Sequence, residues 1–167
     1  SYGTNYRMTE IQATIGRYQL KNLDIQIKKR NQIVKKVINS LKLFWSKYNL
    51  IVKPKFQCDG CTSKKLKIDC NCCTHAFYRF NFYINIKRTE KLKLLDYLQK
   101  KNINCNEGPC PEIYNEKVFK KLKIYPKKKL TNAILLGQKS IAYHINPFIK
   151  TSKLKKDIKI LKLMFSK

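Results

Sequence analysis

Residues 75–86 read HAFYRFNFYINI, a stretch in which apolar side chains recur at every second position. In an extended chain one side would carry Ala76, Tyr78, Phe80, Phe82, Ile84 and Ile86. The other side would carry His75, Arg79, Asn81 and Asn85 together with Phe77 and Tyr83. A period of two is typical of a β-strand. The stretch therefore predicts a strand with one buried face.

Upstream of this strand the pattern is helical. From Thr9 to about residue 48, apolar residues recur at steps of three and four. The apolar stripe shifts between Tyr18 and Leu20, which indicates a bend or two helices that bury different faces. Thr9 is followed three residues later by Gln12, the spacing of a capping box, so we expect the first helix to begin there.

Downstream of the strand, helices and short extended pieces alternate. Thr89 is expected to cap a helix that carries Leu92, Leu95 and Leu98 and ends near Asn102. An extended piece at 103–105 leads into a Gly/Pro loop at 107–111. Further helices are predicted at 112–122 and 130–138, a strand at 140–145, and a last helix from residue 151 or 152, whose stripe is Leu154, Ile158, Leu161 and Phe165.

These elements predict an α/β fold in which helices pack on a small sheet. We expect two regions: a helical segment at 1–48, and a small α/β domain at 49–167 with a cysteine-rich insertion at 57–73. The chain has 167 residues, of which 43% are hydrophobic, enough for a packed domain.

Its apolar runs are too short to span a membrane, and no leader opens it, so we expect a cytoplasmic protein without membrane contact. Because Ser1 rather than Met comes first, we expect a piece of a longer polypeptide.

The charge of the chain is strongly positive, at +27, from 37 Lys and Arg against 10 acids. Only 5 of the 37 are Arg, so 32 are Lys (37 − 5), and they accompany 19 Ile and 14 Asn. A/T-rich codons encode this mixture, and Arg, which grips phosphate with a planar fork, is scarce. We therefore attribute the charge to composition and expect no nucleic-acid partner, although such a field attracts anions.

Five of the seven cysteines lie between Cys58 and Cys73. A C-x-x-C motif is followed by eight intervening residues and then by a C-x-C-C motif. Thiolates in pairs are typical ligands of tetrahedral zinc, so Cys58, Cys61, Cys70 and Cys72 are a candidate structural zinc clip. Reduced thiols in a loop are the alternative, and disulfides are less expected in the cytoplasm.

The opening segment at 3–20 reads GTNYRMTEIQATIGRYQL. It resembles a signature of the DegT/DnrJ/EryC1/StrS family, pyridoxal-phosphate-dependent aminotransferases that act on keto sugars. The match continues at 75–80, HAFYRF, and at 108–114, GPCPEIY, in the same order as in the family. Where the related branch often reads LVHP, this chain reads His144-Ile145-Asn146-Pro147, with the histidine two residues earlier.

The resemblance implies the small C-terminal domain of a fold-type-I aminotransferase and the segment that leads into it. It implies that Asn5 reaches the phosphate of pyridoxal phosphate across a homodimer interface, with Arg7 assisting. A turn-capping role for Asn5, and a carboxylate pair for Arg7, are the structural alternatives. The resemblance also implies that His75, Glu107 and Tyr114 lie near the substrate. The structural alternatives are that His75 is a histidine with satisfied hydrogen bonds, and that Glu107 and Tyr114 lie in an ordinary connecting loop.

In the family, the lysine that forms the Schiff base lies upstream of this signature, so the chain alone is expected to be inactive. The complete enzyme is expected to take an amino group, commonly from glutamate, and pass it to a nucleotide-linked keto sugar for surface polysaccharide or lipopolysaccharide. Three alternatives stay open: a pyridoxal-phosphate-dependent deoxysugar dehydratase of the same fold, a small zinc-binding basic nucleic-acid module, and a non-catalytic subunit that docks on a longer relative.

Overall fold

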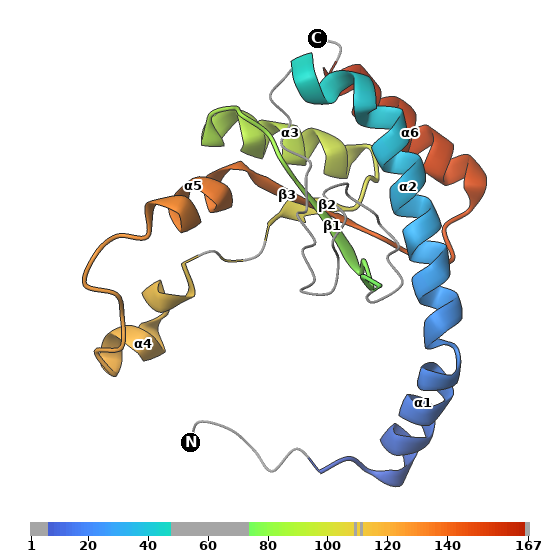
Figure 1. Ribbon diagram of the computed structural model, residues 1–167, viewed down its shortest axis with the longest axis horizontal. Coiled ribbons are helices and arrows are strands. Elements are labelled where there is room, and N and C mark those ends of the chain that lie inside the picture. The colour runs from blue at the N-terminus through green and yellow to red at the C-terminus, as the bar shows by residue number, and fades with distance from the viewer. Residues whose placement is uncertain (1–6, 48–73, 109, 111, 166–167) are drawn as a thin grey trace, which may run out of the picture.

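The computed structural model describes residues 7–47, 74–108, 110 and 112–165. Helices and short strands alternate along it (Figure 1). The helices are α1 (Glu10–Lys21), α2 (Leu23–Lys47), α3 (Arg88–Lys100), α4 (Lys117–Lys121), α5 (Thr131–Lys139) and α6 (Thr151–Phe165). The strands are β1 (Arg79–Tyr83), β2 (Cys105–Glu107) and β3 (Ser140–His144), and a 3-10 turn, η1 (Ile113–Asn115), precedes α4.

The two N-terminal helices confirm the predicted bend. Gln12 N–H donates to Thr9 Oγ1 at 3.3 Å, and Thr9 N–H donates to Gln12 Oε1 at 3.0 Å, which closes the capping box at the start of α1. α1 ends at Lys21, and the backbone N–H of its C-cap residue, Asn22, donates to the Gln19 and Leu20 carbonyls. α2 begins at Leu23 and packs along α6, far from it in sequence (Figure 1).

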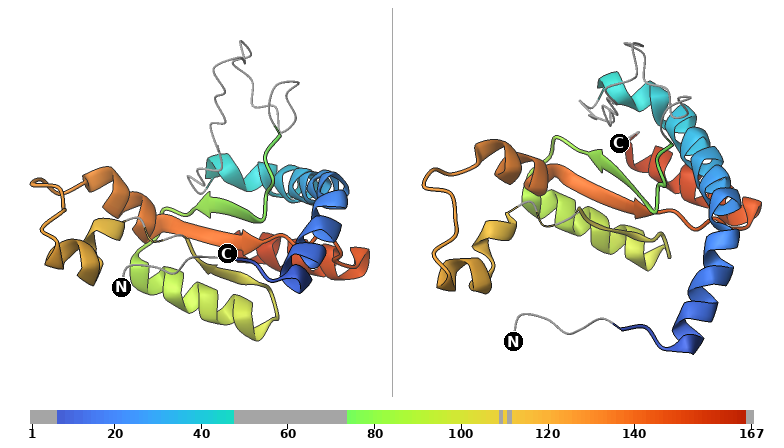
Figure 2. Two further views of the ribbon diagram at one scale, coloured as in Figure 1. Left: turned by 90° about the horizontal axis from the view of Figure 1, so that it is seen from below. Right: turned by 60° about the horizontal axis from the view of Figure 1, so that its bottom comes forward.

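The sheet has three antiparallel strands in the order β1-β3-β2. Its register aligns Phe80 and Cys105 with Tyr143, and Phe82 and Glu107 with Ile141. These rows form the core face, against which the buried side of α3 packs (Figure 2). Buried residues from α2, α3, α6 and all three strands form one cluster, so the predicted packing of helices on a small sheet is confirmed.

The predicted strand at 75–86 is shorter in the structure. Phe77 adopts a φ of 42°, a left-handed conformation that breaks an extended ladder, and its side chain is buried. Regular pairing therefore begins only at Arg79. Phe80, Phe82 and Ile84 are buried as predicted, but Tyr78 is exposed, because the break before it removes the alternation.

Two helix predictions also need correction. The N-cap of α3 is Lys87 rather than Thr89, and the Glu90 carboxylate accepts the Lys87 N–H at 3.1 Å. Leu92 is exposed, and Lys91 takes the buried position beside Leu95 and Leu98. The single helix predicted at 112–122 is divided into η1 and α4, because Glu116 is extended, with φ −61° and ψ 145°.

No helix among the described residues combines the length and the apolar character that crossing a bilayer requires.

The core face makes a direct stability prediction. Phe80 is 1% exposed and Phe148 is 67% exposed. We expect Phe80→Ala to lower the free energy of unfolding by about 3–5 kcal/mol, because it removes buried surface and leaves a cavity. Phe148→Ala, which removes a mostly exposed ring and its contact with Lys29, should cost less than about 1 kcal/mol. Urea unfolding followed by circular dichroism measures both, and equal losses would contradict this core.

Candidate functional site

The loop that follows β2 leaves the sheet in close contact with β3. Gly108 N–H donates to Ser140 O at 3.3 Å. A Cβ atom at Gly108 would overlap the Ser140 hydroxyl, so only glycine permits this approach. The backbone of β3 therefore fixes where the loop begins.

A buried lysine holds Glu107 at the start of this loop. Lys91 is 0% exposed, and its Nζ lies 2.9 Å from Glu107 Oε1 and 3.1 Å from the Gly137 carbonyl oxygen. A buried ammonium is costly unless it is paired and hydrogen-bonded, and both partners are supplied here. Because the Glu107 side chain is still 45% exposed, its carboxylate is anchored yet open to a ligand.

A cavity of about 460 Å³ lies beside this loop, and we call it the acidic cavity. Its lining consists of Arg88, Glu107, Gly108, Cys110, Glu112, Asn115, Glu116, Ile134, Gly137 and Gln138. Three carboxylates face one guanidinium, so the lining offers mainly acceptors, which suit the hydroxyl and amino groups of a polar ligand. Its volume is in the usual range for small-molecule sites.

Tyr114 lies on the same loop and is held by Glu112. The Tyr114 hydroxyl donates to Glu112 Oε1 at 2.8 Å, and Asn115 Nδ2 donates to the same oxygen at 3.0 Å. Desolvation, and then the hydrogen bond and charge of Glu112, raise the pKa of the Tyr114 phenol, so it stays a protonated donor. Tyr114 does not line the acidic cavity but a second cavity, of about 490 Å³, which shares Asn115 with the first.

The sheet face opposite the core is polar. The register places Arg79 beside His144, and Asn81 and Asn106 on either side of Ala142. His144 Nε2 and Asn106 Nδ2 lie 3.2 Å apart. Burial, and then the positive charge of Arg79, lower the pKa of His144. The neutral imidazole is therefore favoured on this face.

His75 has structural contacts of its own. Its Nδ1 accepts the Phe77 N–H at 3.0 Å, and its carbonyl accepts Asn31 Nδ2 at 2.9 Å. Burial lowers the pKa of His75. His75 precedes β1 at the Arg79 end of the sheet, whereas Glu107 aligns with Ile141 at the other end. The structure thus brings Glu107 and Tyr114 onto one loop and keeps His75 apart from them.

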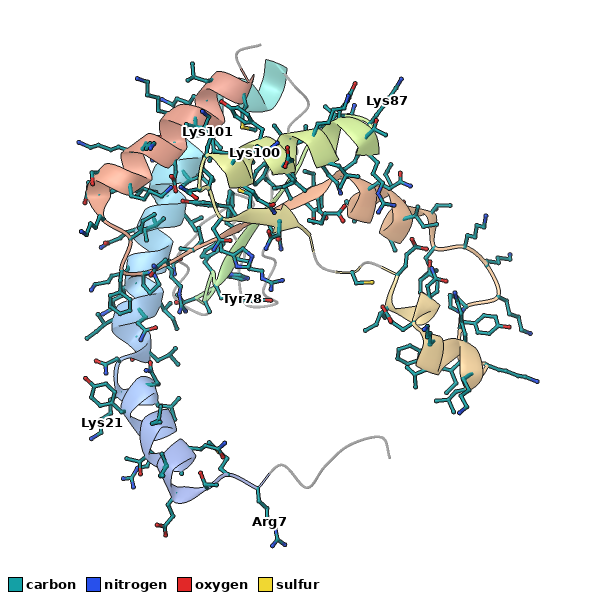
Figure 3. All side chains as sticks on the ribbon, turned by 180° about the vertical axis from the view of Figure 1, so that it is seen from behind. Arg7, Lys21, Tyr78, Lys87, Lys100 and Lys101 are labelled. Carbon is teal, nitrogen blue, oxygen red and sulfur yellow. The ribbon has the colours of Figure 1, made fainter. Side chains whose placement is uncertain are left out.

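The remaining predicted residues lie near the N-terminus and in the insertion. Arg7 is exposed just before α1, and Figure 3 shows its side chain directed away from the helix. Asn5 and the cysteines Cys58, Cys61, Cys70 and Cys72 lie outside the described residues, so their proposed ligands stay predictions. Within the described ranges, no three His, Cys, Asp or Glu side chains are grouped to hold a metal ion.

Sequence reasoning missed the role of Lys91. It lies among other lysines, and nothing in their spacing distinguishes the buried one. The polar sheet face carried a signal, because Arg79 and Asn81 alternate with buried phenylalanines. The sequence carried no signal for Asn106 and His144, because their contact depends on how strands that are distant in the sequence pair.

Comparison with known proteins gives one family over nearly the whole chain. Residues 1–162 match the model of the DegT/DnrJ/EryC1/StrS aminotransferase family. An uncharacterized protein from Methanocaldococcus jannaschii is 28% identical over 148 residues, which cover 87% of this chain and 33% of that protein.

Solved structures give the same fold. An aminotransferase from Psychrobacter cryohalolentis is 25% identical, with a TM-score of 0.78 over 99% of this chain and 41% of its own. An aminotransferase of pseudoaminic acid biosynthesis from Helicobacter pylori is 18% identical, with a TM-score of 0.69 over 99% of this chain and 40% of its own. GDP-4-keto-6-deoxy-D-mannose-3-dehydratase from E. coli, with bound hydrated PLP, is 18% identical, with a TM-score of 0.69 over 96% of this chain and 37% of its own. The chain therefore spans well under half the length of these relatives.

The contact between Gly108 and Ser140 predicts a specific rescue. We expect Gly108→Ala to lower the free energy of unfolding by about 1–3 kcal/mol, because its Cβ overlaps the Ser140 side chain. Adding Ser140→Gly removes the overlapping atoms and should recover part of that loss. Thermal melts of both variants and of Ser140→Gly alone test this, and strictly additive losses would refute the close approach.

The polar sheet face predicts a coupled titration. Replacing Arg79 by Gln removes a positive charge near His144, so we expect the pKa of His144 to rise toward its ordinary value. The pKa of His75, lowered by burial, serves as an internal reference. Protonation of either imidazole disfavours the folded state, so stability should fall as pH drops through the ordinary histidine pKa of about 6.5. NMR titration of both histidines measures these pKa values. An unchanged pKa of His144 in Arg79→Gln would argue against the coupling.

Proposed function

Since the chain belongs to the DegT/DnrJ/EryC1/StrS aminotransferase family, we propose that it is the small C-terminal domain of a pyridoxal-phosphate-dependent enzyme that aminates a nucleotide-linked keto sugar. The observation that carries this proposal is the family match over residues 1–162, joined to a fold whose open loop borders two polar cavities. Glutamate is the proposed amino donor. The product would be an amino-deoxysugar for a surface polysaccharide or lipopolysaccharide.

The described lysines bear on how the cofactor is held. Lys91 is the buried lysine of the described residues, and its Nζ is already engaged by Glu107 and Gly137. A lysine that forms a Schiff base needs a free amine in a desolvated pocket. We therefore propose that the chain provides contacts to the cofactor's phosphate and that the reactive lysine belongs to another part of the enzyme, so that these 167 residues alone would be inactive.

Arg7 and Asn5 are the proposed cofactor contacts. The exposed guanidinium of Arg7 precedes the N-terminus of α1, where backbone N–H groups and the helix dipole also favour an anion. Pyridoxal phosphate supplies the electron sink for the reaction when bound. Asn5 and Arg7 would orient its phosphate.

We propose a homodimer in which these contacts cross the interface. The described side chains of α1 support it, because Ile11, Ile15 and Tyr18 form an apolar stripe but are 73%, 57% and 66% exposed. An apolar helix face of this size is typical of a surface that another protein part covers. We propose that the enzyme works in the cytoplasm.

The substrate would lie along the loop at 107–115. Glu107 and Glu112 offer acceptors for sugar hydroxyls in the acidic cavity, and Tyr114 is the wall of the neighbouring cavity. His75, which is exposed at the opposite end of the sheet, would contact substrate only through an extended part of it.

A dehydratase of the same fold is the second candidate. The observation in its favour is the similarity to the dehydratase from E. coli, whose TM-score of 0.69 equals that of the aminotransferase from H. pylori. The two chemistries would differ in the residue that meets the cofactor, and we propose that this residue belongs to another part of the enzyme.

The reading frame that encodes this chain provides the first test. We expect in-frame coding sequence upstream, with a lysine flanked by Ser and Gly residues after a strand. The purified product should show the visible absorption of bound cofactor, and glutamate should bleach that band. A histidine at the lysine position would favour the dehydratase, and a stop codon directly before Ser1 would overturn the proposal.

A substitution at Asn5 tests the phosphate contact in that complete protein. A hydrogen bond to a charged phosphate contributes about 1.5–3 kcal/mol, so we expect Asn5→Ala to weaken cofactor binding about tenfold or more. Asn132→Ala, on an exposed turn of α5, is the matched control and should leave the affinity unchanged. Equilibrium dialysis of the cofactor measures both, and equal affinities in the two variants would remove Asn5 from the site.

A further inference from the structure

The polar sheet face, which carries Arg79, Asn81, Asn106 and His144, holds polar atoms that the rest of the chain leaves unpaired. Among the described residues, Arg79 Nε and Asn81 Oδ1 are buried and have no hydrogen-bond partner. A buried polar atom without a partner is destabilising unless a ligand supplies one. Arg79 and Asn81 lie two residues apart on the same side of β1. One donor and one acceptor therefore lack partners within a small area.

The guanidinium of Arg79 also lacks an opposite charge. None of the ion pairs in the described part of the chain includes it. Its central carbon lies 5.3 Å from the centre of the Tyr78 ring, which is an uncharged neighbour. The strand positions beside it on the same face carry two asparagines, an alanine and a histidine, and no carboxylate. A partly buried cation without an anion is open to an anionic ligand.

The composition of the chain does not account for Arg79 as it does for the lysines. The chain has 32 Lys (37 − 5) but only 5 Arg, so the bias that supplies the lysines does not explain an arginine at this position. A guanidinium differs from an ammonium group in its planar fork of N–H donors. That fork matches the two oxygens of a carboxylate, with which it forms paired hydrogen bonds.

His144 adds a hydrogen-bond donor beside Arg79. The two residues are partners in the register of β1 and β3. Gln99 Nε2 donates to Asn106 Oδ1 at 3.3 Å, which leaves Asn106 Nδ2 to face His144 Nε2 at 3.2 Å. Because the carboxamide nitrogen is the donor of this pair, Nε2 of the neutral imidazole accepts and Nδ1 carries the hydrogen. Arg79 and the neutral His144 together give the polar sheet face a single positive charge.

These groups suit a carboxylate better than a phosphate. One guanidinium beside a neutral imidazole balances one negative charge, whereas a phosphate group at neutral pH carries nearly two. The unpaired Asn81 Oδ1 in turn needs a donor close to the bound carboxylate. An α-amino acid offers both groups, because its carboxylate and its ammonium group are attached to the same carbon.

We propose that the polar sheet face binds an α-amino acid, with its carboxylate on Arg79 and His144 and its ammonium group on Asn81. This site is separate from the loop at 107–115, which starts at the opposite end of the sheet. The binding chemistry rests on the groups of the polar sheet face alone. Only the choice of glutamate, the proposed amino donor, as the ligand in the cell rests on the function proposed above.

Charge-matched variants of the 167-residue chain test the carboxylate contact. L-Glutamate is titrated at fixed ionic strength and about pH 8, where the imidazoles are neutral, and binding is followed by the NMR signals of His144. We expect Arg79→Gln to weaken glutamate binding about tenfold or more. Arg17→Gln, exposed on α1, removes the same charge and should change the affinity less than about twofold. Circular dichroism verifies that the variants are folded. Equal losses in the two variants would mean diffuse attraction by a net charge of +27 and would overturn the site.

The ammonium contact has its own variant and its own ligand pair. Glutarate lacks the α-amino group of glutamate, so Asn81→Ala should weaken glutamate binding about fivefold or more and glutarate binding less than about twofold. Equal effects on the two ligands would overturn the assignment to an α-amino acid. Inorganic phosphate that binds more tightly than glutamate, and is lost in Arg79→Gln, would overturn it in favour of a phosphate site. Since no cofactor enters these titrations, their failure is separate from a failure of the cofactor and reading-frame experiments.

Discussion

The position of the candidate site depends on one buried cation. The Lys91 ammonium, removed from water on the inner side of α3, requires both an opposite charge and a hydrogen-bond acceptor. Glu107 at the end of β2 provides the first, and the Gly137 carbonyl near the end of α5 provides the second. Three elements that are distant in sequence therefore meet at one nitrogen. The loop at 107–115, whose described residues line both cavities, starts from this junction.

Much of the fold follows from local sequence chemistry. The capping box at Thr9, a bend within the N-terminal helical segment, the strand that begins at Ser140 and the apolar stripe of α6 were predictable, because each depends on neighbours within a few residues. The errors have non-local causes. Lys91 rather than Leu92 is buried because its ammonium pairs with Glu107 and donates to the Gly137 carbonyl. Phe77 adopts a left-handed backbone conformation, and its ring is buried.

The site was less accessible to sequence reasoning. The motif that contains Glu107 and Tyr114 was enough to predict that they belong to the site. It did not predict that their loop lines two cavities whose charged residues are of opposite sign. That division depends on Glu116, whose extended backbone separates η1 from α4, and on the left-handed Lys123. The count of 32 lysines (37 − 5) determines most of the net charge of the molecule, but it does not tell which lysines line a cavity.

The exposed stripe of α1 indicates what this domain needs from its surroundings. Within the described residues α1 has no buried side chain, so its apolar side chains gain little from burial there. Its direction is set by the cap at Thr9 and by the single residue Asn22, whose side chain donates to the Tyr18 carbonyl at 3.1 Å. Two local caps hold a helix together but fix its angle to α2 weakly. The orientation of α1, and with it the position of Arg7, should therefore depend on whatever surface covers Ile11 and Ile15, which would link the proposed cofactor contact to assembly.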